Sequence, residues 1–231
     1  HIRHQLNYQR ACNEIALINR ETGNVLYGVD SMFTIVGHRY TFLKPLFSLK
    51  AFRWFIEKLY AFISYNRKVI APAKAFESKD SCTPDYHRTW RWIYIAFAWI
   101  ITSIILTMYA KLVTDFLPAG GFGREFIICG GQLVFQSITI FILRRERLLH
   151  YLGNMMTISL AGSFLLLPAI VIAQFNLVYN PAFYLVWFIA VVGLMFFEHL
   201  RRVKYLGVHW FASASWVAYR FIVLTILFWL L

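Results

Sequence analysis

Residues 91–113 read RWIYIAFAWIITSIILTMYAKLV, and this stretch decides the class of the fold. Its length matches the roughly 20 apolar residues that an α-helix needs to cross the hydrocarbon core of a bilayer. Its two charged residues lie near its ends, and Trp92 lies where an interfacial aromatic anchor is expected. The stretch therefore predicts a transmembrane helix.

Four further apolar stretches follow, at residues 125–143, 151–175, 181–199 and 211–231. Each is close to the length of one membrane crossing. They are separated by a Pro/Gly-rich loop, two basic segments and a polar segment, and the last of these leads into Pro181, a residue that suits the first turn of a helix. The sequence predicts an all-α membrane domain of about five transmembrane helices over residues 91–231.

The composition also favours a membrane location. Of the 231 residues, 59% are hydrophobic and 15% are charged, whereas soluble domains carry about 25% charged residues. One small globule cannot bury so many apolar side chains, so the lipid bilayer is the expected partner. The net charge of +12 comes from Lys and Arg that flank the apolar stretches. This placement argues against a nucleic-acid partner and favours contact with anionic headgroups.

The loop charges predict the orientation in the membrane, because Lys and Arg are enriched in cytoplasmic loops. Two loops of the membrane region together carry six basic residues, and the opposite side carries only Lys111 and Arg124. With five spans, every basic segment is cytoplasmic if the N-terminus is cytoplasmic and the C-terminus lies outside. We therefore expect a multi-pass protein of a bacterial inner membrane. The basic residues of the two loops are Arg144, Arg145, Arg147, Arg201, Arg202 and Lys204.

Residues 1–70 predict a small α+β segment on the cytoplasmic side. Residues 14–19 and 25–29 read as two strands on either side of the turn RETGN, a pattern typical of a β-hairpin. A short helix is expected to follow, capped by Asp30 or Ser31.

A longer helix is predicted at about 46–65, after Pro45. Its apolar residues recur at spacings of three and four, with basic residues between them. This pattern fits either the core helix of a small domain or a basic amphipathic helix on the membrane surface. Residues 71–90 contain two prolines and mixed charge without a period, and they read as a linker.

The hairpin and the longer helix carry recognisable residues. The first strand reads Ile15-Ala-Leu-Ile-Asn19, the turn contains Thr22-Gly-Asn24, and the second strand continues as Val25-Leu-Tyr-Gly-Val-Asp30. The helix ends in Tyr60-Ala-Phe-Ile-Ser-Tyr-Asn-Arg67. These residues resemble the C-terminal half of the DCC family of thiol-disulfide oxidoreductases. The resemblance implies a partial thioredoxin-like fold for residues 1–70.

The sequence departs from that family in its redox motif. The family's chemistry rests on a D-x-x-C-x-x-C segment at the start of its domain, and no C-x-x-C occurs in this sequence. Two nearby thiols are needed, because one attacks the disulfide and the other resolves the mixed disulfide. Either a catalytic part precedes His1, as the lack of an initial Met suggests, or the segment is a non-catalytic form.

The sequence predicts no catalytic, cofactor or metal site. Cys12, Cys82 and Cys129 are far apart and odd in number, so they indicate neither a disulfide framework nor a metal-ligand cluster. No phosphate-binding glycine loop, G-x-S-x-G or H-E-x-x-H occurs in the sequence.

Two sets of polar residues in the membrane region are candidate sites. Cys129, Gln132 and Gln136 share one face of the second span, where they could hydrogen-bond between helices or line a path for a quinone or a substrate. Arg220 lies near the middle of the fifth span, where a charge is costly. It is expected to pair, to extend toward the membrane surface, or to take part in a mechanism.

A second candidate cluster lies at the cytoplasmic ends of the spans. Its members could converge on a metal ion, or two histidines could hold a haem. The alternative is that they are interfacial residues in contact with headgroups. The cluster consists of His150, Glu198, His199 and His209.

Three functions fit this sequence. The first is an inner-membrane protein with a DCC-like cytoplasmic appendage, a relative of thiol-disulfide oxidoreductases that is non-catalytic as given. The second is a structural or accessory subunit of a larger membrane-protein complex, which five spans without a catalytic set would suit. The third is a small transporter component, supported by the polar face of the second span and by Arg220.

Overall fold

The computed structural model describes residues 6–72, 86–118, 120–121 and 123–229, and the chain divides into two units, at residues 1–92 and 93–231. Most of the predicted linker, including Cys82, lies outside the described residues. Each unit has its own secondary structure. The first is a small α+β unit, and the second is entirely helical where the structure describes regular elements.

Unit 1 contains the predicted hairpin. Strands β1 and β2 pair antiparallel, with Leu17 opposite Leu26, which confirms the hairpin. The side chain of Asn19 organises the turn by accepting hydrogen bonds from the backbone N–H groups of Glu21 and Thr22. The elements are α1 (Tyr8–Asn13), β1 (Ala16–Ile18), β2 (Val25–Tyr27), α2 (Gly28–Arg39), the 3-10 helix η2 (Thr41–Leu43), α3 (Lys44–Ser48) and α4 (Lys50–Ile70).

The helix predicted at about 46–65 is in fact two helices. The backbone of Leu49 is extended, with φ −69° and ψ 118°, and it separates α3 from α4. The Ser48 hydroxyl donates to the backbone carbonyl of Pro45 at 2.7 Å, so the polar groups of the short α3 are satisfied locally. Because only a short turn can form between Pro45 and the extended residue, the amphipathic helix begins later than its hydropathy pattern suggested.

Helix α4 is buried near its C-terminal end and exposed over most of its length. Asn66 and Val69 are buried, whereas apolar side chains nearer the N-terminal end, Phe55 and Ile63 among them, are exposed. The Nδ2 group of Asn66 donates to the carbonyls of Phe62 and Trp90. Both interpretations of this helix therefore stay open, because one end lies in a core and the remainder presents apolar side chains outward.

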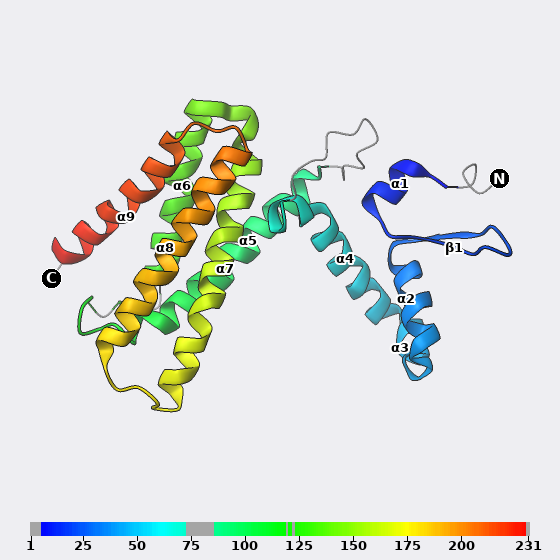
Figure 1. The fold of residues 1–231 in the computed structure, drawn as a ribbon, viewed down its shortest axis with the longest axis horizontal. Helices are drawn as coiled ribbons and strands as arrows, with labels where there is room; N and C mark the ends of the chain where they lie inside the picture. The colour runs from blue at the N-terminus through cyan, green and yellow to red at the C-terminus, as the bar shows by residue number, and fades with distance from the viewer. Residues whose placement is uncertain (1–5, 73–85, 119, 122, 230–231) are drawn as a thin grey trace. The chain divides into compact units, whose positions relative to one another are not determined.

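Unit 2 is a bundle of long helices (Figure 1). Within it, α7 packs against α8, α6 packs against both α7 and α9, and α8 packs against α9. Helix α5 begins in unit 1 and continues into this unit. The helices are α5 (Arg88–Ala110), α6 (Arg124–Arg144), the 3-10 helix η3 (Arg145–Arg147), α7 (Leu148–Gln174), α8 (Pro181–Tyr205) and α9 (Phe211–Trp229).

Within the described part of the chain, four helical segments are long and apolar enough to cross a membrane: 88–110, 124–174, 181–205 and 211–229. The second has 51 residues, which is far more than one crossing needs. It comprises α6, η3 and α7. The backbone leaves the helical region at Arg144, where φ is −159° and ψ is 76°, and α6 and α7 then lie against each other. Residues 124–174 are therefore a helical hairpin.

Specific residues determine where α8 begins and where it ends. At its start, the Asn180 side chain accepts from the backbone N–H of Ala182 at 3.0 Å, and Pro181 occupies the first turn, as predicted. At its end, Gly207 has φ +62°, a left-handed conformation that glycine adopts without strain. The helix continues to Tyr205. The prediction of a basic loop starting at Arg201 was therefore wrong, because these basic residues lie on the last turns of a helix.

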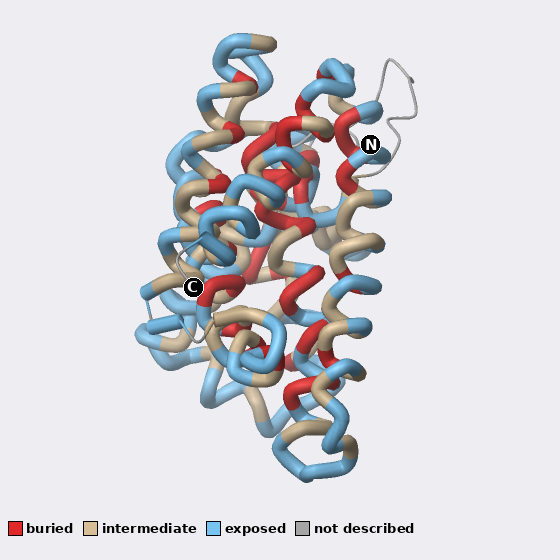
Figure 2. The backbone as a smooth tube through the Cα atoms, turned by 90° about the vertical axis from the view of Figure 1, so that its left-hand side faces the viewer, coloured by how far each residue is buried: buried red, intermediate tan, exposed pale blue. Residues whose placement is uncertain are grey.

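The core of unit 2 has two buried clusters. One includes Tyr151, Met155 and Trp216, and the other includes Tyr109 and Leu166. Figure 2 shows buried positions as short red stretches interrupted by pale blue ones along each helix, as expected for helices with one inward face. Two glycines permit close helix approach: a Cβ on Gly131 would overlap the Tyr219 hydroxyl, and one on Gly162 would overlap the Met195 sulfur. A Cβ at either position would force the neighbouring side chain to move.

Candidate functional site

A chain of hydrogen bonds connects four helices inside unit 2. The Tyr151 hydroxyl of α7 donates to Gln136 Oε1 of α6 at 2.8 Å and lies 3.0 Å from His199 Nε2 of α8. His199 Nδ1 lies 3.1 Å from the Ser213 hydroxyl of α9. All four side chains are buried. Because Tyr151 gives its proton to Gln136, His199 donates from Nε2 and accepts at Nδ1, which is the pattern of a neutral imidazole.

Gln136 reaches α9 through Tyr151, His199 and Ser213, and it also contacts α9 directly at Ser215. Gln136 Nε2 donates to the Ser215 hydroxyl at 3.2 Å, and that hydroxyl donates in turn to the backbone carbonyl of Ala212 at 3.0 Å. Each polar atom of Gln136 therefore has a partner on a neighbouring helix. Buried polar groups in a bilayer must be satisfied within the protein, and this network meets that requirement.

A group of charged residues lies next to this network. Glu198 accepts two hydrogen bonds from Arg201, both at 2.6 Å, and one from Arg202 Nε at 2.7 Å. Arg202 Nη1 also donates to Asn154 Oδ1 of α7 at 3.0 Å. Arg202 is 7% exposed, so it connects α8 to α7 from inside the bundle.

Arg220 is the central residue of α9 and has a different environment. Its guanidinium lies over the Trp216 indole, with Cζ 4.0 Å from the ring centre. Its Nε atom is buried without a hydrogen-bond partner, and none of the residues that the structure describes forms an ion pair with it. A charge at the centre of a membrane span is costly, and such residues usually face a polar cavity or a partner. The Trp216 ring supplies part of that compensation through a cation–π contact.

Arg220 lines a cavity of about 470 Å³ within unit 2. Its walls come from all five long helices and are mostly apolar. The polar lining includes Gln132, whose side chain is 8% exposed and whose Nε2 atom has no partner, and Thr102, whose hydroxyl has none. Cys129 also lines the cavity, and its thiol is free.

An ion pair lines the same cavity. Arg124 Nη2 and Glu125 Oε1 are 2.7 Å apart, and their side chains are 17% and 12% exposed. Arg124 also donates to the backbone carbonyl of Pro118. The single carboxylate of the cavity is therefore neutralised by the neighbouring arginine.

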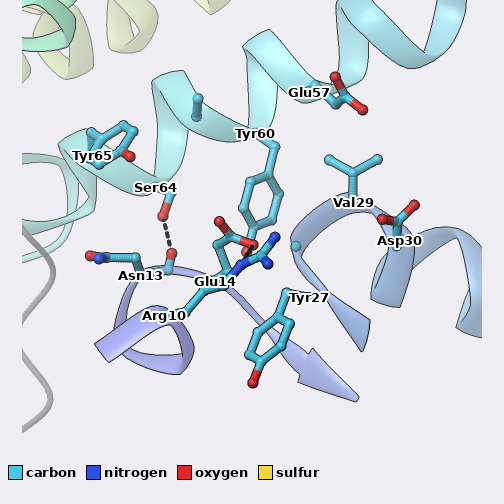
Figure 3. Close-up of a pocket in the computed structure, with 12 residues that line it drawn as sticks. Arg10, Asn13, Glu14, Tyr27, Val29, Asp30, Glu57, Tyr60, Ser64 and Tyr65 are labelled. Carbon is cyan, nitrogen blue, oxygen red and sulfur yellow. Dashed lines mark hydrogen bonds and ion pairs between the residues drawn. The ribbon is translucent and has the colours of Figure 1, made fainter. Parts of the chain in front are cut away.

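A smaller pocket of about 230 Å³ lies in unit 1, between α4 and the segment from α1 to α2. Figure 3 shows Tyr60 of α4 pointing toward Arg10 and Glu14. The Tyr60 oxygen accepts from the backbone N–H of Ile15 at 2.8 Å, and the Ser64 hydroxyl donates to the backbone carbonyl of Asn13 at 2.5 Å. These bonds fix α4 against the start of the hairpin.

Gly28 and Asp30, which belong to the motif of the second strand, have structural roles at this pocket. Gly28 has φ +58°, and a Cβ there would lie 2.8 Å from Glu14 Oε2, so only glycine fits. Asp30 pairs with Arg53, which also bonds Glu57 at 3.0 Å. These hydrogen bonds, first that of Asp30, raise the pKa of Arg53. The pairs are exposed, so they add little to stability.

Cys12 precedes the hairpin and corrects one expectation. It is buried and disulfide-bonded, although the scattered cysteines indicated no disulfide framework. Its backbone carbonyl accepts from Arg67 of α4 at 2.6 Å. Spacing in the sequence gave no signal of this bond, because the chain between bonded cysteines can be long.

The predicted site residues fall into separate places. Cys129, Gln132 and Arg220 line one cavity, while Gln136 belongs to the network of Tyr151 and His199. His199 is buried in that network and is not at an interface with headgroups.

The remaining members of the predicted cytoplasmic cluster lie elsewhere. Glu198 pairs with arginines, and the ring nitrogen of His209 accepts from the backbone N–H of Phe211 at 3.2 Å. The backbone carbonyl of His150 accepts from Asn154. Among the described residues, no group of three or more His, Cys, Asp or Glu is arranged to hold a metal ion.

Sequence reasoning missed several members of the network. Tyr151 and Asn154 are three positions apart on α7, and Ser213, Ser215 and Trp216 share a buried face of α9. The polar residues in these apolar runs were a usable signal. Which of them meet, however, depends on helix packing, which the periodicity of a single helix does not specify.

No known protein family, curated protein or solved structure matches this chain.

Proposed function

We propose that this chain is a multi-pass protein of a bacterial inner membrane that crosses the bilayer five times and serves as an accessory subunit of a larger membrane assembly. Its N-terminal unit is cytoplasmic and its C-terminus lies on the opposite side. Five crossings follow if α6 and α7 each cross once. Their lengths, 21 and 27 residues, and the turn between them at η3 support this count.

The distribution of basic residues supports the orientation. The turn between α6 and α7 and the turn between α8 and α9 lie at the same end of the bundle in Figure 1. Arg144, Arg145 and Arg147 occupy the first turn, and Lys204 lies near the second. Basic residues gather on the cytoplasmic side of membrane proteins, so this end is assigned to the cytoplasm.

The accessory role rests mainly on the outward surface of α8 and α9. Only 17% of the apolar window of α8 and 22% of that of α9 is buried within the chain, against 39% for α5. Large exposed side chains on the two helices include Phe197 and Phe228. Helix faces rich in bulky apolar groups can pack against partner helices as well as lipid. Such partners would be membrane proteins, and no cofactor is part of the proposal.

We further propose that unit 1 is a non-catalytic relative of the DCC family. The paired strands and the glycine-specific backbone at Gly28 support this relationship, since both belong to the residues that carry the resemblance. A thiol-disulfide exchange assay on the purified chain tests it. No turnover of a disulfide substrate is expected, and turnover that is lost when all three cysteines are replaced would overturn the non-catalytic assignment.

Native mass analysis after extraction in a mild detergent tests the accessory role. The expected result is a complex with other membrane proteins in fixed stoichiometry, which dissociates when Phe197 and Phe228 are both changed to Ala. A monodisperse monomer in mild detergent and in native nanodiscs would contradict it. Replacing Ile127 and Ile142 on α6, both also exposed, is the matched control for lost apolar surface.

A transporter component is the alternative function, and the cavity at Arg220 is the observation that favours it. Uptake of a radiolabelled small carboxylate into proteoliposomes would support this role if Arg220→Gln abolished it. Uptake that is absent, or equal in wild type, Arg220→Gln and Gln132→Leu, would remove the alternative.

A further inference from the structure

The cavity at Arg220 has an excess of hydrogen-bond donors. The Arg220 Nε group and the Gln132 Nε2 group are both buried without partners, and the Thr102 hydroxyl is also unpaired. All three residues line the same cavity. Unsatisfied buried donors are rare in folded proteins, and several at one cavity indicate a missing acceptor.

Three other polar side chains of this cavity are already engaged with partners. Glu125 is paired with Arg124 at 2.7 Å, the Tyr219 hydroxyl donates to the backbone carbonyl of Ile128 at 2.8 Å, and the Ser163 hydroxyl donates to that of Leu160 at 2.8 Å. With its one carboxylate neutralised, the cavity carries the net positive charge of Arg220. An anionic acceptor would complement both this charge and the unpaired donors.

The remainder of the lining is apolar, and the cavity opens toward the outside of the bundle. Leu166, Phe188 and Val191 are among the apolar residues of the wall. Phe221 and Leu224 of α9 line the cavity and are also exposed, so the opening lies at α9. At the middle of a membrane span, that opening faces the hydrocarbon region. An occupant that enters there must have an apolar body.

We propose that this cavity binds a single-chain amphiphile with an anionic oxygen head. Arg220 and Gln132 bind the head, and the apolar tail lies along the apolar wall near α9. The Arg220 Nε group has no hydrogen-bond partner, and a guanidinium suits carboxylate and phosphate oxygens in bidentate geometry. The head could be the carboxylate of a fatty acid or the phosphate of a lysophospholipid. This inference goes beyond the accessory role and does not depend on it.

Equilibrium binding to the full chain in phosphatidylcholine nanodiscs tests the proposal. The probes are radiolabelled oleate, lysophosphatidate and, as the uncharged analogue, methyl oleate. Wild-type protein is expected to bind oleate or lysophosphatidate saturably. The probe that binds more tightly shows whether the preferred head is a carboxylate or a phosphate. Methyl oleate should bind at least tenfold more weakly. Equal binding of oleate, lysophosphatidate and methyl oleate, or saturable binding of none, overturns the proposal without any variant.

Variants then assign the binding to Arg220. Arg220→Gln should weaken binding of the charged probe about ten- to a hundredfold, the usual effect of losing a charged hydrogen bond, and Arg220→Lys should retain most of it. Arg147→Gln, which removes the same charge from an exposed position, should change nothing. Unchanged binding by a folded Arg220→Gln protein would overturn the assignment. The native mass of the assembly is measured separately, so failure of one proposal is distinguishable from failure of the other.

Discussion

The Arg220 guanidinium lies over the Trp216 indole, with Cζ 4.0 Å from the ring centre. The His199 imidazole also stacks on that indole, at a centroid distance of 5.3 Å and an interplanar angle of 24°. Trp216 thus contacts both the residue that charges the cavity and the histidine of the hydrogen-bond network. The cavity and the hydrogen-bond network therefore share one buried aromatic side chain.

Trp216→Ala is expected to destabilise unit 2 strongly, because Trp216 is 1% exposed and is a member of the larger buried cluster. Truncating a buried aromatic side chain usually costs about 3–5 kcal/mol of unfolding free energy. The unfolding midpoint in detergent, followed by tryptophan fluorescence, measures the loss. Trp229→Ala removes a side chain that is 86% exposed and should leave the midpoint unchanged. Equal effects from the two variants would contradict the packing described for Trp216.

Tyr151→Phe removes one hydroxyl at the centre of the hydrogen-bond network. It leaves Gln136 Oε1 and His199 Nε2 with fewer partners, and an unsatisfied buried group costs about 1–3 kcal/mol. A loss of that size in unfolding free energy is expected, with coupling to Gln136→Leu in a double-mutant cycle. Tyr179→Phe, at an exposed tyrosine, is the control. Strict additivity of Tyr151→Phe and Gln136→Leu would show that the network is not cooperative.

Gly131→Ala is expected to disturb the packing of α6 against α9, because the added Cβ would overlap the Tyr219 hydroxyl. Overpacking of this kind costs about 1–3 kcal/mol. The combination with Tyr219→Phe should recover part of the loss, since it removes the overlapping oxygen. Gly193→Ala adds a Cβ where no atom lies within 4 Å and should be neutral. If Gly131→Ala unfolds at the same temperature as wild type, α6 and α9 are not in the close contact described.

Hydropathy located the long helices well, because apolar side chains in a run of membrane-spanning length have few alternatives to a helix. The same signal failed at Leu49, where two short-range features, Pro45 and the Ser48 hydroxyl, set a break inside an amphipathic pattern. It also placed Arg202 in a loop, although that residue bonds Asn154 inside the bundle. Local charge indicates a loop only where no partner is available on another helix.

Side-chain spacing predicted which face of α6 is polar but not how its residues divide. Gln132 and Gln136 are one helical turn apart, yet Gln132 lines the cavity and Gln136 belongs to the network with Tyr151 and Ser215. The difference is made by residues on α7 and α9 that are far away in the sequence. Contacts of this kind arise from packing between helices, which a single sequence does not specify.

The location of the two chain ends tests the proposed membrane architecture most directly, because five crossings place them on opposite sides and four would place them on the same side. Epitope tags at each end, probed in sealed inside-out and right-side-out membrane vesicles, report this location. The N-terminal tag should be cleaved by protease only in inside-out vesicles, and the C-terminal tag only in right-side-out vesicles. Cleavage of both tags in the same preparation would contradict five crossings and the orientation proposed here.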